Sequence, residues 1–139
     1  KRQAYAQSLH QSVIEKGLSD RIIFTGARSD IRDIYGISQL VFSLSTKPES
    51  FGRTVLEALR IGVPTVGYDH GGVGEILTAM FAQGKVELGN ADELDAVVKS
   101  LIESGQKPAE STCFTKQDML ENTLAVYNSL VVAPHNKEI

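Results

Sequence analysis

The sequence predicts an α/β domain with a Rossmann-like parallel sheet and flanking helices. Short apolar segments alternate with amphipathic segments along the 139 residues, and glycines close several of them. Residues 39–44 are apolar almost throughout, which indicates a strand covered on both faces of its sheet. Alternating strands and helices are typical of parallel β-α-β units with right-handed crossovers. We therefore expect one domain over residues 1–132 and a disordered tail over residues 133–139.

The first half of the chain opens with a predicted helix over residues 3–16, in which Tyr5, Leu9 and Val13 recur at every fourth residue. The pattern is helical from the first residues, so we expect the chain to be part of a longer protein. The bounds of the other elements are predicted from apolar runs and from the residues at which those runs end. The expected strands here cover residues 21–25 and 39–44, and the expected helices cover residues 30–37 and 53–61.

The second half continues with a predicted strand over residues 64–68, followed by the glycine-rich turn Gly71-Gly72-Val73-Gly74. A short helix over residues 73–79 and a weak strand over residues 85–88 come next. A helix from residue 90 to 104 carries apolar residues at helical spacing. A polar linker then leads to a last helix that starts at Thr115. The inward residues expected in the helix over residues 90–104 are Leu94, Val97, Val98 and Leu101.

Composition excludes several classes of protein. The net charge is −3, and the lysines and arginines form no basic stripe, which argues against a nucleic-acid partner. No apolar run reaches the roughly 20 residues that span a bilayer, so we expect no transmembrane segment. Cys113 is the lone cysteine, which fits a reducing compartment and predicts an unreactive side chain. No His or Cys cluster has metal-ligand spacing, so we expect no metal and no cofactor.

The most informative segment runs from Glu49 to Glu57 and places a Phe-Gly step between two carboxylates. Gly52 allows the backbone to approach a ligand closely, and the helix that follows begins with free amides at residues 52–54. Such a helix end binds phosphate without a metal. A carboxylate accepts two hydrogen bonds from a vicinal diol, so each glutamate suits hydroxyl groups. The segment predicts a nucleotide-sugar site, with Glu57 at the ribose and Glu49 at the sugar.

Simpler interpretations remain open for single residues. Glu57 alone is compatible with a solvated helix surface, and Glu49 alone with a helix-capping carboxylate. The run Gly71-Gly72-Val73-Gly74 fits backbone contact with the ligand as well as it fits a tight turn. Arg53 at a helix start is more often solvated than paired with phosphate. A loop or packing role is favoured for His70 over that of a general base.

The segment resembles the donor-binding motif of a large group of retaining glycosyltransferases of GT-B fold, often called family 4. Glu49 and Glu57 match the E-x7-E motif of that family. Further matches are Phe51-Gly52, Glu57-Ala58-Leu59, Gly62-Val63-Pro64-Thr65-Val66, Gly71-Gly72-Val73-Gly74-Glu75-Ile76, the segment from Leu18 to Gly26, and Phe114 through Tyr127. The resemblance covers nearly the whole chain and implies the C-terminal half of a GT-B fold, truncated at its N-terminal side.

The resemblance implies a role for each matched position. Glu49 is expected to act at the transferred sugar, as the catalytic position, and Glu57 at the ribose. The loop around Gly26 is expected to line the base. The family also has an Arg and a Lys that steady the leaving diphosphate, in a segment that precedes residue 1. The expected donor-binding residues are Gly26, Ala27, Arg28, Ile31, Ser50, Phe51, Gly52, Arg53, Thr54 and Glu57.

The implied function is transfer of a sugar from a UDP-, GDP- or ADP-sugar to an acceptor hydroxyl with retention. The implied partner is an N-terminal acceptor-binding domain, without which we expect the chain to be inactive. We expect a cytoplasmic location, with any membrane association made through that domain. Three alternatives stay open: a nucleotide-sugar epimerase of GT-B fold, a non-catalytic nucleotide-sugar-binding module, and a response-regulator-like domain, for which Asp30 and Asp69 make a poor phosphorylation pocket.

Overall fold

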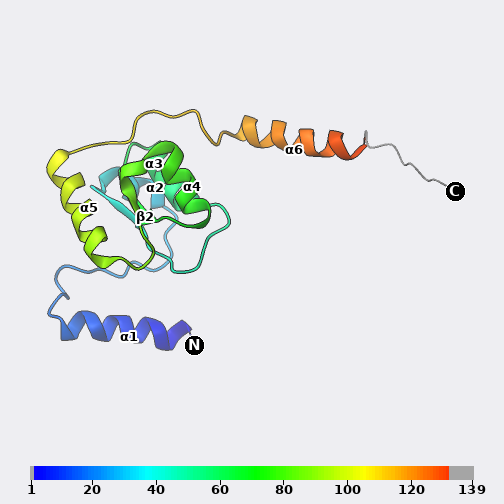
Figure 1. Cartoon of the computed structure of the whole chain (residues 1–139). Coiled ribbons are helices and arrows are strands. Elements are labelled where there is room, and N and C mark those ends of the chain that lie inside the picture. Colours follow the sequence, from blue (N-terminus) through cyan, green and yellow to red (C-terminus); the bar gives the residue numbers. More distant parts are fainter. Residues whose placement is uncertain (1, 132–139) are drawn as a thin grey trace. The chain divides into compact units, whose positions relative to one another are not determined.

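The computed structural model describes residues 2–131 and divides them into two compact units. The first unit ends at Ile31 and the second begins at Arg32. Figure 1 shows the elements of both in chain order. The predicted tail over residues 133–139 lies outside the described residues. Each unit is described by itself.

The first unit contains helix α1 (Arg2–Glu15) and an extended segment that carries no strand. The prediction of a strand over residues 21–25 is therefore wrong. The amides of Arg21 and Ile22 both bond back to the Leu18 carbonyl at 3.0 Å, so this segment begins as a turn. A strand also needs a neighbour to take up its backbone hydrogen bonds, and no described strand pairs with it. As a result, Ile23 is left 83% exposed.

The second unit is built on a parallel three-stranded sheet in the order β1-β2-β3. The strands are β1 (Val41–Ser43), β2 (Thr65–Tyr68) and β3 (Lys85–Val86). Val41 pairs with Thr65, and Gly67 pairs with Lys85. All three strands lie within the ranges that the apolar runs predicted. Because they are parallel, the loops after β1 and β2 emerge at the same edge of the sheet.

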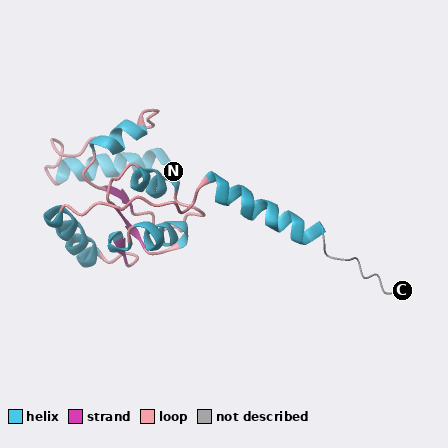
Figure 2. Cartoon of the chain, turned by 90° about the horizontal axis from the view of Figure 1, so that it is seen from above, coloured by secondary structure: helices cyan, strands magenta, loops and turns pink. Residues whose placement is uncertain are grey.

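Helices connect and cover these strands, as the β-α-β pattern predicted (Figures 1 and 2). In Figure 1, β2 lies between α5 and the pair formed by α3 and α4. Helices α3 and α4 contact each other, and α5 packs on β2 and β3. The helices of this part of the chain are α2 (Ile31–Ile37), α3 (Arg53–Arg60), α4 (Gly71–Met80), the 3-10 turn η1 (Ala82–Gly84), α5 (Ala91–Ser104) and α6 (Lys116–Val131).

The core of the second unit lies where α3, α4 and α5 meet the sheet. Val55, Val66 and Leu77 are fully buried in it, and Leu101 of α5 closes it. The other expected inward residues of α5, Leu94, Val97 and Val98, pack against this core as partly buried side chains. A smaller cluster beneath α2 contains Tyr35, Val41, Ala58 and Val63. This packing holds β1, α3 and β2 in fixed relation, and these three elements position the candidate site.

Helix α3 ends just before Gly62, close to the predicted end at residue 61. The Val63 amide bonds to the Ala58 carbonyl at 3.0 Å, and the Gly62 amide bonds to the Leu59 carbonyl at 3.0 Å. This is a Schellman motif, and it requires the left-handed conformation that Gly62 adopts at φ 86°. In contrast, α4 starts at Gly71 rather than at the predicted residue 73. No described helix is long and apolar enough to cross a bilayer.

Candidate functional site

The amino end of α3 is the centre of the candidate site. Gly52 is the N-cap residue, and its carbonyl accepts hydrogen bonds from the amides of Val55 at 3.1 Å and Leu56 at 3.2 Å. No side chain caps this end. Among the described residues, no hydrogen bond takes up the amides of Arg53 and Thr54, and both residues are exposed. The positive end of the α3 dipole is therefore open to an anionic ligand.

Gly52 is required at this position for two reasons. Its φ of 84° lies in the left-handed region. Residues with a Cβ adopt this region at a cost of about 1–2 kcal/mol. A Cβ on Gly52 would also lie 3.1 Å from Cγ2 of Val73 in α4. Gly52 itself is buried, in contrast to its two neighbours in α3. It therefore sets the backbone geometry, and the accessible amides are those of Arg53 and Thr54.

The two glutamates lie on either side of this helix end along the chain, and both are exposed. Glu49 lies in the loop after β1, with Ser50 and Phe51 between it and Gly52. Glu57 follows in α3, about 6 Å along the helix axis from Arg53 at the usual rise per residue. Helical side chains tilt toward the amino end of their helix, which brings the Glu57 carboxylate closer to the open amides.

A groove of about 410 Å³ lies beside Glu57, between α2 and α3. Its floor includes Tyr35, which is 6% exposed, and its rim carries Arg32 and Arg60. The guanidinium of Arg60 donates to the backbone carbonyl of Cys113, so that cation has a partner within the chain. Sequence reasoning did not find Arg32 or Tyr35, because nothing in their spacing relates them to the Glu49–Glu57 segment.

The glycine-rich first turn of α4 packs directly on the loop that carries Glu49. The Gly72 amide donates to the Glu49 carbonyl at 2.9 Å. A Cβ on Gly72 would lie 2.4 Å from the Phe51 carbonyl oxygen, and one on Gly71 would lie 2.7 Å from that of Glu49. Both glycines are thus explained by the close approach of two backbones. The Gly72 amide is taken up within the chain, which favours the tight-turn interpretation of this motif.

The residues predicted to line the base lie in the first unit. Gly26 has a φ of 66°, and Ala27, Arg28 and Ile31 are exposed. The Arg28 guanidinium pairs with the Asp30 carboxylate, with Nε to Oδ1 at 2.7 Å. This hydrogen bond lowers the pKa of Asp30 below its ordinary value. The Arg28 guanidinium therefore has a partner within the chain.

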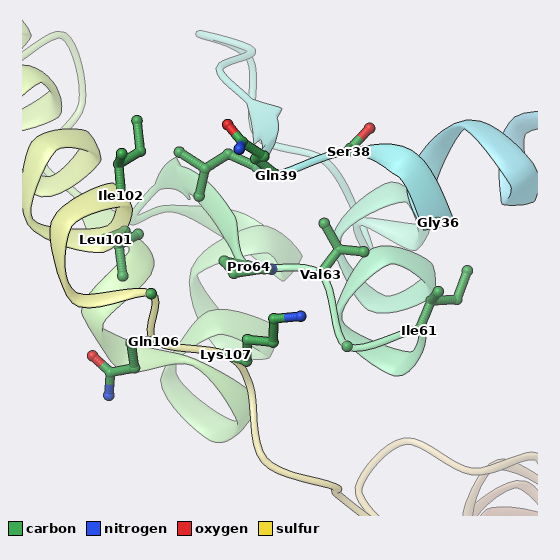
Figure 3. Close-up of a pocket in the computed structure, with 13 residues that line it drawn as sticks. Gly36, Ser38, Gln39, Ile61, Val63, Pro64, Leu101, Ile102, Gln106 and Lys107 are labelled. Carbon is green, nitrogen blue, oxygen red and sulfur yellow. The ribbon is translucent and has the colours of Figure 1, made fainter.

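A separate cavity of about 380 Å³ lies at the opposite end of the sheet (Figure 3). Gln39 precedes β1 and Pro64 precedes β2, so the cavity is at the amino ends of both strands. Gln106 and Lys107, from the segment that follows α5, also line it. The predicted site residues of the second unit follow the carboxyl end of β1, and none of the predicted site residues lines this cavity. Within residues 2–131, no three His, Cys, Asp or Glu side chains are grouped as metal ligands.

Comparison with known proteins identifies the family. The family model described as "Glycosyl transferases group 1" matches residues 2–117, and the chain belongs to this family. The lipopolysaccharide core biosynthesis mannosyltransferase LpsB of Rhizobium meliloti is 39% identical over 98 residues, which are 68% of this chain and 26% of that protein. Mannosylfructose-phosphate synthase of Agrobacterium fabrum is 43% identical over 67 residues, 47% of this chain and 14% of that protein.

The solved structures lead to the same fold. HepE of Anabaena in complex with UDP-glucose superimposes with a TM-score of 0.68 at 34% identity, over 75% of this chain and 29% of that one. This match confirms the predicted Rossmann-like C-terminal half of a GT-B fold. The chain spans about a quarter of the length of LpsB and a little more of HepE. Both proteins therefore contain long segments outside the region of similarity.

Proposed function

We propose that this chain is the donor-binding part of a retaining glycosyltransferase, which transfers a sugar from a nucleotide-diphosphate donor to an acceptor hydroxyl. One observation carries the proposal: an uncapped helix end with two open amides lies between two exposed glutamates. An anion at the helix end, flanked by hydroxyl-rich groups, matches the chemistry of a nucleotide-sugar. Membership of the glycosyl transferases group 1 family supports the reaction type.

The diphosphate binds at the amino end of α3 in this proposal. The amides of Arg53 and Thr54 donate to its oxygens, and the Thr54 hydroxyl adds a further donor. Gly52 shapes the turn, while Ser50 and Phe51 form the loop that leads into it. As the bond to the sugar breaks, negative charge builds on the leaving diphosphate, and a fixed helix end stabilises that charge without reorganisation.

The two carboxylates recognise the groups on either side of the diphosphate. Glu57 accepts hydrogen bonds from the ribose hydroxyls, and Glu49 accepts them from the transferred sugar. Neither faces the diphosphate itself, because like charges would repel. A carboxylate that holds the sugar hydroxyls fixes the orientation of the reacting carbon, and we assign Glu49 as the catalytic position on that basis.

The remaining parts of the proposal concern the base and the acceptor. Gly26, Ala27, Arg28 and Ile31 line the base, chiefly through backbone atoms. The acceptor binds to a domain outside this chain, and transfer requires that domain, so the chain alone is inactive. No metal or cofactor takes part, and the enzyme works in the cytoplasm. Titration of the longer protein with donor and acceptor, with the anomeric configuration of the product read by NMR, tests retention.

A thermal-shift panel of UDP, GDP and ADP tests the donor site on the chain as it stands. A ligand that binds only the folded state raises the midpoint of unfolding as its concentration rises. We expect at least one nucleotide to raise it in a concentration-dependent way, and we expect adenosine or uridine alone to have a weaker effect. Equal shifts from nucleoside and nucleoside diphosphate would contradict a site centred on the helix amides.

A further inference from the structure

The loop that carries Glu49 is held from a second strand by an imidazole that the proposed reaction does not use. His70 follows β2 and is the N-cap residue of α4, but its side chain does not cap that helix. Its Nε2 lies 2.9 Å from the backbone carbonyl of Ser45, in the loop after β1. Twenty-five residues separate the two along the chain, so this contact fixes one loop relative to the other.

The contact is one of two hydrogen bonds that join the loop after β1 to the start of α4, and the two enclose the segment with Glu49. At one end, His70 binds the Ser45 carbonyl, and at the other, the Gly72 amide binds the Glu49 carbonyl at 2.9 Å. Between them lie Thr46, Lys47 and Pro48, all exposed. Within the segment, the Ser45 hydroxyl donates to the Lys47 carbonyl at 2.9 Å. An exposed loop of this kind keeps one shape only while both ends are held.

We propose that His70 is a positioning residue for the donor sugar. It fixes the Ser45 carbonyl, and so it holds the loop in the shape that directs the Glu49 carboxylate at the sugar hydroxyls. The inference rests on the proposed function, because it needs Glu49 to contact the sugar. It extends that function to a residue that touches no part of the donor. Because a carbonyl accepts the hydrogen bond, Nε2 carries the proton and donates it.

The position of His70 also predicts which part of the donor is bound less well when the imidazole is removed. The helix end at Arg53 and Thr54 is held separately, by the packing of Gly52 on Val73 and by the burial of Val55. Loss of the imidazole therefore loosens the Glu49 segment while the diphosphate-binding amides keep their geometry. The contribution of the sugar to affinity falls, and the affinity for the nucleoside diphosphate is unchanged. A role for His70 in general stability would lower both together.

The experiment compares His70→Ala, His70→Gln and the unchanged chain, with Gln83→Ala, an exposed polar residue of η1, as the matched control. Gln places an amide N–H close to the position of the imidazole Nε2 and can donate to the same carbonyl. Two measurements are made on each chain. The first is amide hydrogen exchange without ligand in residues 46–50, of which Pro48 has no amide hydrogen. The second is calorimetric titration with UDP and with UDP-glucose.

We expect His70→Ala to speed exchange in residues 46–50 about tenfold or more and to abolish any preference for UDP-glucose over UDP, with UDP affinity within about twofold of the unchanged chain. We expect His70→Gln to restore most of both properties, and Gln83→Ala to change neither. Unchanged exchange in His70→Ala would overturn the inference, as would an equal loss of UDP and UDP-glucose affinity. If no UDP, GDP or ADP binds the unchanged chain, the proposed function fails, and the positioning role at the donor sugar falls with it even where exchange changes.

Discussion

The ring of Phe114 meets the ring of Phe51 edge-on, with centroids 6.1 Å apart and an interplanar angle of 84°. Phe51 directly precedes Gly52 at the candidate diphosphate site, and Phe114 lies shortly before α6. Phe114 has a φ of 59°, in the left-handed region that a phenylalanine rarely adopts, and it packs against the core. The contact therefore fixes the segment before α6 against the loop before α3, at the expense of local backbone strain.

A double-mutant cycle between Phe51→Leu and Phe114→Leu measures this relationship. Edge-to-face aromatic pairs contribute about 0.5–1.5 kcal/mol beyond their buried area. We expect a coupling free energy in that range from urea unfolding followed by far-UV circular dichroism. Effects of the two substitutions that add to within about 0.3 kcal/mol would show that the rings do not interact in solution.

Replacement of Gly52 by alanine tests the backbone geometry of the helix end. The left-handed φ of 84° predicts a loss of about 1–2 kcal/mol of unfolding free energy. The 3.1 Å approach to Val73 adds to that loss and displaces the amides, so nucleotide binding falls as well.

Gly89→Ala is the matched control for this substitution. Gly89 also has a left-handed φ of 79°, but a Cβ there would meet nothing within 4 Å. It lies in the turn before α5, away from α3 in the sequence. We expect Gly89→Ala to be the milder substitution and to leave nucleotide binding unchanged. Equal losses of stability and of binding in the two variants would refute a special role for Gly52.

A capping box at the start of α6 makes the stability of that helix depend on pH. The Thr115 amide donates to the Asp118 carboxylate at 2.9 Å, and the Asp118 amide donates to the Thr115 hydroxyl at 3.0 Å. The hydrogen bond from the Thr115 backbone is the main cause that lowers the pKa of Asp118 below its ordinary 3.8, and the bond with the Thr115 side chain adds to it.

Because the pKa is lower in the folded state, the carboxylate stabilises α6 above its ordinary pKa, and this contribution is lost as pH falls through the folded value. We expect helical ellipticity to drop as pH is lowered from about 6 to about 2, and to drop less in Asp118→Asn. Identical titrations of the two chains would exclude the capping box as the cause.

The sequence predicted the second unit well because its signals are local and mutually consistent. Gly62 ends α3 in a motif that needs a left-handed residue, and the apolar run that contains Val41 is a strand because Thr65 and its neighbours pair with it. The start of α3 was predicted within the Glu49–Glu57 segment, and the role of that segment as a site stays a prediction.

The features that the sequence did not predict share another cause. The apolar run at Ile22, Ile23 and Phe24 has strand composition, but strand formation depends on a pairing partner that local sequence does not supply. Likewise, no spacing rule relates His70 to Ser45, and the contact between the His70 ring and the Ser45 carbonyl became visible only in the folded chain.

Calorimetric titration of UDP, GDP and ADP into the unchanged chain and into Glu57→Gln tests the central claim most directly. Hydrogen bonds to a charged group contribute about 1.5–3 kcal/mol, so loss of the carboxylate weakens binding about tenfold or more. Glu103→Gln, which removes an exposed carboxylate of α5, is the control. The account predicts that at least one nucleotide binds, that Glu57→Gln weakens it and that Glu103→Gln does not. The absence of any binding, or equal affinity in the two variants, would contradict it.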